Sequence, residues 1–165
     1  MTIKTMHDLL VTGLTYVLDF EERIGKAAPD MASASTDKDL KEAFEKTTTK
    51  SQDYAKAVEA AFEKIGESPK RAENHIAVAM IREVNGMVEG TEPGAVRDAA
   101  LIVAANQQQQ FRVASYGSMQ AYAKALGKED ALAKMREALE DSKNGDKKFT
   151  DIAETRVNPQ AAKAA

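Results

Sequence analysis

Residues 95–126 read AVRDAALIVAANQQQQFRVASYGSMQAYAKAL, a stretch that contains no proline and a single glycine. As a helix it would be about 50 Å long, at about 1.5 Å per residue. The sequence Thr91-Glu92-Pro93-Gly94 precedes it and Gly127 follows it, and residues of these types commonly mark the ends of helices. The sequence therefore predicts one long helix that ends at Leu126.

Stop signals elsewhere divide the chain into four further helical segments. Their expected bounds are about Thr5–Ser33, Thr36–Ile65, Ser68–Gly90 and Glu129–Arg156. Thr5 and Thr36 are the expected N-caps, and the pair Ser68-Pro69 is typical of a helix start. Pro29 is expected to kink or restart the first helix, because its ring removes a backbone hydrogen-bond donor.

This order of segments predicts an all-α protein, since no candidate strand lies between the turns. Four long helices joined by short loops favour an antiparallel four-helix bundle, with the short segment as an additional helix. A chain of 165 residues suits one domain that buries roughly 70% of its unfolded surface. We expect the bundle to occupy residues 1–158, and residues 159–165, after Asn158, to form a frayed tail.

The composition excludes several classes of protein. The chain has 23 Lys or Arg and 26 Asp or Glu, and its net charge of −3 disfavours nucleic-acid binding. The absence of cysteine excludes a disulfide scaffold, a thiolate nucleophile and an iron–sulfur cluster. The most apolar run, Leu9–Leu18, is shorter than the roughly 18–20 residues that a membrane span requires. We therefore expect a cytoplasmic protein without a membrane partner.

The expected bundle helices carry apolar stripes that become polar halfway along. Residues spaced alternately three and four apart face a bundle interior. The stripe of the first helix is Leu10, Leu14, Val17, Glu21, Ile24 and Ala28. That of residues 95–126 is Ile102, Ala105, Gln109, Arg112, Tyr116, Met119, Ala123 and Leu126. That of the fifth is Leu132, Met135, Leu139, Ser142, Asp146, Phe149 and Ala153.

A charge inside a bundle is costly unless it has a partner or binds a metal. The stripes therefore predict one polar layer across the bundle, formed by Glu21, Gln109, Arg112, Ser142 and Asp146. The second helix also has a polar centre, TTTKSQ at 47–52, and three successive threonines form helix poorly. The alternative is that several of these side chains lie at the edge of a stripe and extend to water.

The sequence resembles the bacterial YciE/YciF-type ferritin-like proteins over nearly its whole length. The segments that carry the resemblance are KTMHDL (4–9), VRDAALI (96–102), ASYGS (114–118), AKALG (123–127), TDIA (150–153) and VN (157–158). The resemblance implies a ferritin-like four-helix bundle with a small extra helix, usually dimeric. It also implies an association with bacterial stress responses and no well-defined enzymatic activity.

The resemblance further implies a mid-bundle cluster of Glu, His and Asp for two metal ions, which this chain retains only in part. Glu21 and Asp146 match acidic positions of that cluster. Thr49 and Gln52 stand where the second helix would supply Glu and His, and Gln109, Arg112 and Ser142 stand at Glu positions. The implied polar core layer is Glu21, Thr49, Gln52, Gln109, Arg112, Ser142 and Asp146. These departures argue against ferroxidase or iron-storage chemistry.

Two functional hypotheses follow. The first is a non-catalytic structural or stress-associated protein without a cofactor, in which Arg112 replaces the missing cations by pairing with Glu21, Asp146 or both. The second is a divergent metal-binding relative or di-metal carboxylate oxidase, in which Glu21, Asp146, Gln109 and Ser142 supply oxygen ligands to Mg²⁺, Ca²⁺ or Mn²⁺. We prefer the first, because Arg112 would repel a metal ion at the same level.

A homodimer is expected from the run Ala99–Ala105, AALIVAA, which is apolar around its whole circumference. A helix of that kind must be covered on every side, and the short third helix and a second subunit could supply the covers. The run Asn106–Gln110 could instead bind a partner protein through amide hydrogen bonds, although helical spacing directs only Gln109 inward. No glycine-rich phosphate loop is present, so no small-molecule substrate is indicated.

Overall fold

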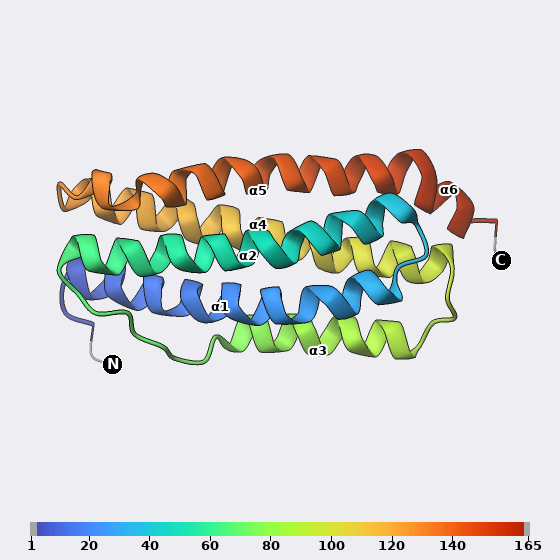
Figure 1. Ribbon diagram of the computed structural model, residues 1–165, viewed down its shortest axis with the longest axis horizontal. Helices are drawn as coiled ribbons and strands as arrows, with labels where there is room; N and C mark the ends of the chain where they lie inside the picture. Colours follow the sequence, from blue (N-terminus) through green and yellow to red (C-terminus); the bar gives the residue numbers. More distant parts are fainter. Residues whose placement is uncertain (1–2, 164–165) are drawn as a thin grey trace.

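The computed structural model describes residues 3–163 as an elongated bundle of helices (Figure 1). The helices are α1 (Met6–Ala34), α2 (Lys38–Ile65), α3 (His75–Glu89), α4 (Ala95–Ala125), α5 (Ala133–Ile152) and α6 (Asn158–Ala161). Neighbouring helices among α1, α2, α4 and α5 run antiparallel, and the short α3 packs against α1 and α4. The predicted all-α four-helix bundle with one short additional helix is confirmed.

The core consists of apolar clusters on either side of a polar middle. One cluster contains Leu10, Leu14 and Leu18 of α1 with Tyr116 and Met119 of α4, and Phe62 and Leu132 lie in it. Another contains Leu101, Ile102 and Ala105 of α4 with Met31, Phe44 and Phe149. The buried side chains of Glu21, Ser51 and Arg112 lie between these levels. The bundle is therefore apolar toward both ends and polar halfway along, as the stripes predict.

The first helix begins where the sequence predicts but is not broken at Pro29. Thr5 is its N-cap, because the N–H of Asp8 donates to Thr5 Oγ1 at 3.0 Å and the Asp8 carboxylate accepts from the N–H of Thr5 at 2.9 Å. The helix continues through Pro29 to Ala34. Met31 and Ala32, each 4% exposed, pack into the core beyond the proline, and this packing keeps the last turn helical.

The second helix is capped by Asp37, one residue later than predicted. The Asp37 carboxylate accepts hydrogen bonds from the N–H groups of Asp39 and Leu40, each at 3.0 Å. Thr36 cannot serve as the cap because its hydroxyl donates to the buried Asp98 of α4 instead, at 2.5 Å. A contact between distant parts of the chain therefore decides where α2 begins.

The third helix begins at His75 instead of Ser68. Its N-cap is Asn74, whose side-chain oxygen accepts from the N–H groups of Ile76 and Ala77, each at 3.0 Å. The Asn74 side chain also donates to the carbonyl of Tyr16 on α1 at 2.9 Å, and its N–H donates to Asp19 at 2.7 Å. Residues 67–74 run as irregular chain beside α1.

The C-terminal segment departs from the predicted single helix and frayed tail. A 3₁₀ turn at Glu129–Leu132 precedes α5, and a π-helical turn at Ala153–Val157 follows it. The helix resumes as α6 through Pro159, in its first turn, where a missing N–H is harmless. Val157 is 1% exposed, so burial extends the fold past Arg156. Residues 159–161 are therefore helical, and residues 164–165 of the predicted tail lie outside the described residues.

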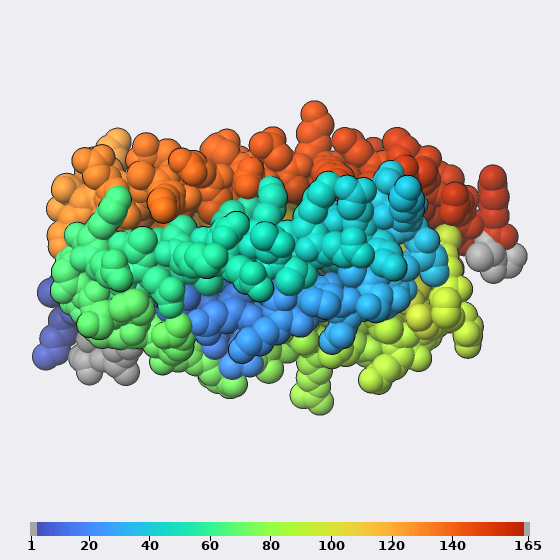
Figure 2. Space-filling model, in the orientation of Figure 1, coloured from blue at the N-terminus to red at the C-terminus, as the bar shows by residue number. Residues whose placement is uncertain are grey.

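On the face shown in Figure 2, α2 lies between α1 and α5 along the length of the bundle. None of the helices within residues 3–163 has the length and apolar character to cross a membrane. Several large apolar side chains are nevertheless exposed: Ile3, Met6, Tyr16, Ile76, Val96 and Val103.

Candidate functional site

The polar middle of the bundle is built around an ion pair between Glu21 of α1 and Arg112 of α4. Arg112 Nε donates to Glu21 Oε1 and Arg112 Nη2 donates to Glu21 Oε2, both at 2.8 Å. The two side chains are almost fully buried, at 0% and 2% exposure. Parallel, charge-assisted bonds of this kind are about twice as strong as neutral ones, and they fix the relative positions of α1 and α4.

Two further side chains complete the hydrogen bonds of this pair. The hydroxyl of Tyr116 donates to Glu21 Oε1 at 2.5 Å, and Arg112 Nη2 also donates to Ser51 Oγ of α2 at 2.9 Å. Arg112 and Tyr116 are four residues apart on α4, so they lie on the same helix face. Three helices therefore contribute to one buried network.

Two aromatic rings flank the guanidinium. The Cζ atom of Arg112 lies 5.5 Å from the ring centroid of Phe20 and 5.6 Å from that of Tyr54. Both distances fall within the range of cation–π attraction. Phe20 in turn stacks on Phe111, with centroids 4.1 Å apart. The surroundings favour a planar cation over a hydrated metal ion.

The electrostatics hold Arg112 charged and Tyr116 neutral. Burial alone would lower the pKa of Arg112, but the charge and hydrogen bonds of Glu21 raise that pKa above its ordinary value. Burial, followed by the negative charge of Glu21, raises the pKa of Tyr116 well above its ordinary value. Burial and then the charge of Asp141 raise the pKa of Tyr54 as well. The two phenols are therefore hydrogen-bond donors and not bases.

Of the predicted layer, the structure buries Glu21, Arg112, Gln109 and Ser142. Ser142 donates its hydroxyl to the carbonyl of Ala138 in its own helix at 2.8 Å, so it does not join the ion pair. Asp146 is only half-buried, and the hydrogen bonds of Arg112 go to Glu21 and Ser51. The prediction that Arg112 pairs with Glu21 thus fits the structure, whereas the Asp146 alternative does not.

Thr49 and Gln52 are exposed, so their placement in the buried layer was wrong. Of the run TTTKSQ, Thr47 and Ser51 are buried instead. The helix turns these two inward because they are four residues apart and lie in line with the buried Phe44 and Val58. Sequence reasoning therefore missed Ser51 as a partner of Arg112, although Ser51 lies on the apolar face of the predicted helix.

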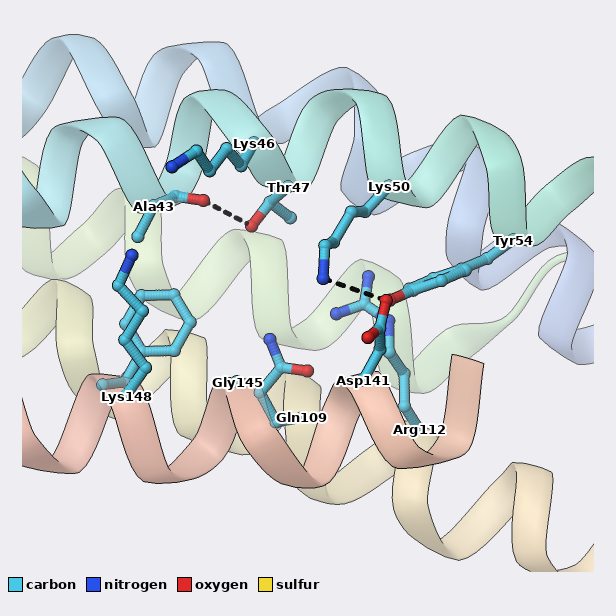
Figure 3. A pocket seen from close by; sticks show the side chains of 11 residues that line it. Ala43, Lys46, Thr47, Lys50, Tyr54, Gln109, Arg112, Asp141, Gly145 and Lys148 are labelled. Carbon is cyan, nitrogen blue, oxygen red and sulfur yellow. Dashed lines mark hydrogen bonds and ion pairs between the residues drawn. The ribbon is translucent and has the colours of Figure 1, made fainter. Parts of the chain in front are cut away.

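A small cavity adjoins the ion pair between α2, α4 and α5 (Figure 3). Its volume is about 110 Å³, and Gln109 and Arg112 of α4 form part of its wall. Lys46 and Lys50 of α2 and Lys148 of α5 line the same space. Beside the ion pair, the polar layer therefore consists of the Gln109 amide and three lysines that line this cavity.

The donor set does not fit a di-metal site. Among residues 3–163, no three histidine, aspartate or glutamate side chains converge in an arrangement that could hold a metal ion. Both oxygens of Glu21 already accept hydrogen bonds from Arg112, and one accepts from Tyr116 as well. A metal ion beside Glu21 would have to displace a buried guanidinium.

The fold and this layer define an all-α, four-helix-bundle protein with a short additional helix and a buried ion pair at its centre. The chain belongs to the family described as "Domain of unknown function (DUF892)", which its sequence matches over residues 5–162. This family match bears out the resemblance to YciF-type proteins, and the individual relatives agree with it.

Protein YciF of Escherichia coli (strain K12) is 32% identical over 164 residues, which cover 98% of each chain. The crystal structure of the E. coli stress protein YciF matches with a TM-score of 0.89 and 30% identity, covering 94% of this chain and 99% of that one. YcfI of Rhodopseudomonas palustris, described as a candidate structural protein, matches with a TM-score of 0.86 and 27% identity, covering 90% and 94%. These relatives are named as stress or structural proteins and not as enzymes.

Proposed function

We propose that this protein is a non-catalytic structural protein of the bacterial stress response, whose mid-bundle layer is closed by a guanidinium instead of metal ions. The main observation behind the proposal is the bidentate ion pair of Arg112 with Glu21, whose two hydrogen bonds are each 2.8 Å long. A buried carboxylate needs a positive partner, and here the chain supplies that partner itself. The names of its relatives support a stress or structural role.

The chemistry of the layer supports the same proposal. A general base must be free to accept a proton from a substrate, but the oxygens of Glu21 are occupied by Arg112 and Tyr116. Tyr116 remains protonated because its pKa is raised by burial and by the charge of Glu21. The layer therefore stabilises the fold and presents neither a base nor a nucleophile.

The first test is elemental analysis of protein purified without added metal, together with a measurement of Fe²⁺ oxidation. We expect substoichiometric metal and an oxidation rate equal to that of buffer. Iron or manganese at one or two ions per chain would favour the metal-binding alternative, with Glu21, Asp146, Gln109 and Ser142 as ligands, and would overturn the proposal.

A gain-of-function variant provides the matched comparison. Replacing Gln109, Arg112 and Ser142 by glutamate together restores acidic side chains at three positions where the resemblance implies them. These buried carboxylates repel one another, so Mn²⁺ should raise the melting temperature of this variant and leave that of the native chain unchanged. A similar rise in both proteins would contradict the proposal.

The stress association is tested in the host bacterium. We expect the amount of this protein, measured by quantitative proteomics, to rise under osmotic or oxidative stress. An amount that stays constant under every stress applied, while established stress proteins increase, would contradict that part of the proposal.

We further propose that the protein forms a homodimer in the cytoplasm. A groove of about 600 Å³ runs between α1, the start of α3 and α4, and Tyr16, Ile76 and Phe111 line it. Tyr16 and Ile76 are 44% and 53% exposed. Apolar patches of this kind commonly mark protein interfaces, and a second copy of the chain would cover all three side chains.

Sedimentation or light scattering tests the dimer. We expect a mass of twice the 17.9 kDa of one chain at micromolar concentration. Ile76→Glu should shift the mass toward the monomer, because it places a charge in the groove. Thr49→Glu, at an exposed site on α2, is the control with the same introduced charge. A monomeric native chain, or equal dissociation in both variants, would contradict the proposal.

A further inference from the structure

The side-chain amide of Gln109 lines the cavity between α2, α4 and α5. Gln109 is 7% exposed, and among residues 3–163 no hydrogen bond to its side chain is formed. Its amide group points into the hollow between α2 and α5 (Figure 3). The amide is not fully enclosed by protein, so water or a ligand in the cavity can form hydrogen bonds with it.

Gly145 of α5 makes room for this amide. A Cβ atom at position 145 would lie 3.1 Å from Gln109 Cδ and 3.2 Å from Gln109 Nε2. Glycine within a helix is less favourable than alanine, and here it leaves space for the amide beside α5. The packing thus preserves the cavity at the expense of helix propensity.

A second fixed donor group lines the same space. The bonds of Arg112 to Glu21 and Ser51 use its Nε and Nη2 atoms, and within the described part of the chain Nη1 has no hydrogen-bond partner. Arg112 lines the cavity beside Gln109. Because Glu21 holds the guanidinium rigidly, a ligand that accepts from Nη1 would meet a preorganised donor.

The mouth of the cavity is rich in positive charge. Lys46, Lys50 and Lys148 line it. Lys46 pairs with Glu42 at 2.5 Å and Lys50 pairs with Asp141 at 3.0 Å, while Lys148 has no ion pair with any residue in 3–163. These lysines are exposed donors at the surface, and they line the same cavity as Gln109 and Arg112.

From this arrangement we infer that the cavity binds a small tetrahedral oxyanion such as inorganic phosphate or sulfate. Four oxygens would accept hydrogen bonds from Gln109 Nε2, Arg112 Nη1 and the lysine ammonium groups. The cavity of about 110 Å³ exceeds the roughly 10–15 Å³ that a single water requires, so an ion of this size fits. A cation would meet an ammonium-lined entrance, and an apolar molecule would leave the amide unpaired.

This inference goes beyond the proposed structural role, and it does not depend on whether the layer once held metal. The probes are inorganic phosphate and sulfate, measured by calorimetry and by thermal unfolding. EDTA is present throughout, so that no anion enters as a metal complex, and sodium chloride keeps the ionic strength constant. We expect saturable binding of one anion per chain, and a rise in melting temperature that equal ionic strength of chloride does not produce.

Lys148→Gln and Lys147→Gln form a matched pair of variants. They are adjacent on α5, both are exposed, and each removes one positive charge, but only Lys148 lines the cavity. We expect Lys148→Gln to weaken phosphate binding about tenfold, which corresponds to the loss of one charged hydrogen bond, and Lys147→Gln to change it less than twofold. Equal weakening in both would show general attraction to the surface and would overturn the inference.

Two further variants test the inner wall. Gly145→Ala should weaken binding by shifting the Gln109 amide into the cavity, while the higher helix propensity of alanine keeps the protein folded. Asp141→Asn should tighten binding severalfold, because among residues 3–163 Asp141 is the one carboxylate that lines the cavity. Unchanged phosphate affinity in a folded Gly145→Ala protein, or weaker binding in Asp141→Asn, would overturn the inference.

Discussion

The carboxylate of Asp98 on α4 accepts hydrogen bonds from both the hydroxyl and the backbone N–H of Thr36, at 2.5 and 2.8 Å. The N–H of Asp37 adds a third bond at 2.8 Å. Asp98 is 2% exposed, so these three bonds replace the hydrogen bonds that its carboxylate would otherwise form with water. The turn between α1 and α2 is thus held in place by a residue near the beginning of α4.

Asp98→Asn should therefore lower the free energy of unfolding by about 1–3 kcal/mol. The amide group replaces one acceptor oxygen by a donor, which would face donors already in place. Urea unfolding measures the change. Asp151→Asn removes an exposed carboxylate on α5 and should change the stability by less than about 0.5 kcal/mol. Equal losses in the two variants would contradict the structural role of Asp98.

Arg112→Ala should cost about 3–5 kcal/mol, the penalty for leaving a buried charge without its partner. The double variant Glu21→Gln with Arg112→Met should recover part of that loss, because neither charge remains. Denaturant unfolding at neutral pH gives the three free energies. Arg136→Ala, at an exposed position on α5, is the control. If Arg112→Ala unfolds at the same urea concentration as the native chain, the ion pair contributes nothing to stability.

The raised pKa of Tyr116 predicts a loss of stability in alkali. Burial and the charge of Glu21 keep its hydroxyl protonated in the folded state, whereas in the unfolded chain a tyrosine ionises near pH 10. Above about pH 10 the folded state holds the extra proton, so stability falls as the pH rises, by up to about 1.4 kcal/mol per unit. Tyr54 contributes with the same sign.

Tyr116→Phe should make this alkaline slope shallower. The measurement is the free energy of unfolding in urea at a series of pH values from neutral to about 11, on either side of the usual tyrosine pKa. At neutral pH the variant should lose about 1–3 kcal/mol, since Glu21 loses a buried donor. Tyr16→Phe, which removes a hydroxyl from a partly exposed ring, serves as the control. An unchanged slope in Tyr116→Phe would refute the assignment.

Asn74→Ala should loosen α3 from the bundle. The variant removes the N-cap of α3 and the hydrogen bond to the carbonyl of Tyr16, at a cost of about 1–2 kcal/mol for the cap alone. Hydrogen exchange should become faster in residues 75–89 before it does so in α1 or α2. Asn85→Ala, at an exposed site within α3, should not accelerate that exchange. Uniformly faster exchange throughout the chain would contradict a local effect.

The helical periodicity predicted the bundle and the position of its ion pair. Glu21 and Arg112 interrupt the apolar stripes of two different helices at the same level along the bundle. Because burying a lone charge is costly, the two side chains were expected to form an ion pair. The bidentate geometry of the ion pair, and the hydrogen bond of Arg112 to Ser51, could not be derived in this way. They depend on how α2 is rotated about its axis, and the TTTKSQ run has polar side chains on every face.

Helix ends were predicted well only where local contacts determine them. The N-cap at Thr5 depends on contacts between residues three apart and was predicted from the sequence. The starts of α2 and α3 depend on Asp98 and on the Tyr16 carbonyl, which are far away in the chain. The continuation past Arg156 depends on the burial of Val157 and on ion pairs of Arg156 with Asp37 and Asp39, at 3.1 and 2.7 Å. Such tertiary contacts leave no local signal.

The central ion pair also determines the alignment of the helices along the bundle axis. Apolar faces made of Leu, Val and Ala can pack in more than one longitudinal position, because their side chains are chemically alike. Sliding α1 by one turn, about 5.4 Å, would move Glu21 away from Arg112. Each displaced charge would then lie unpaired in a dry interior. A single polar level thus selects one alignment out of several that the apolar residues alone would allow.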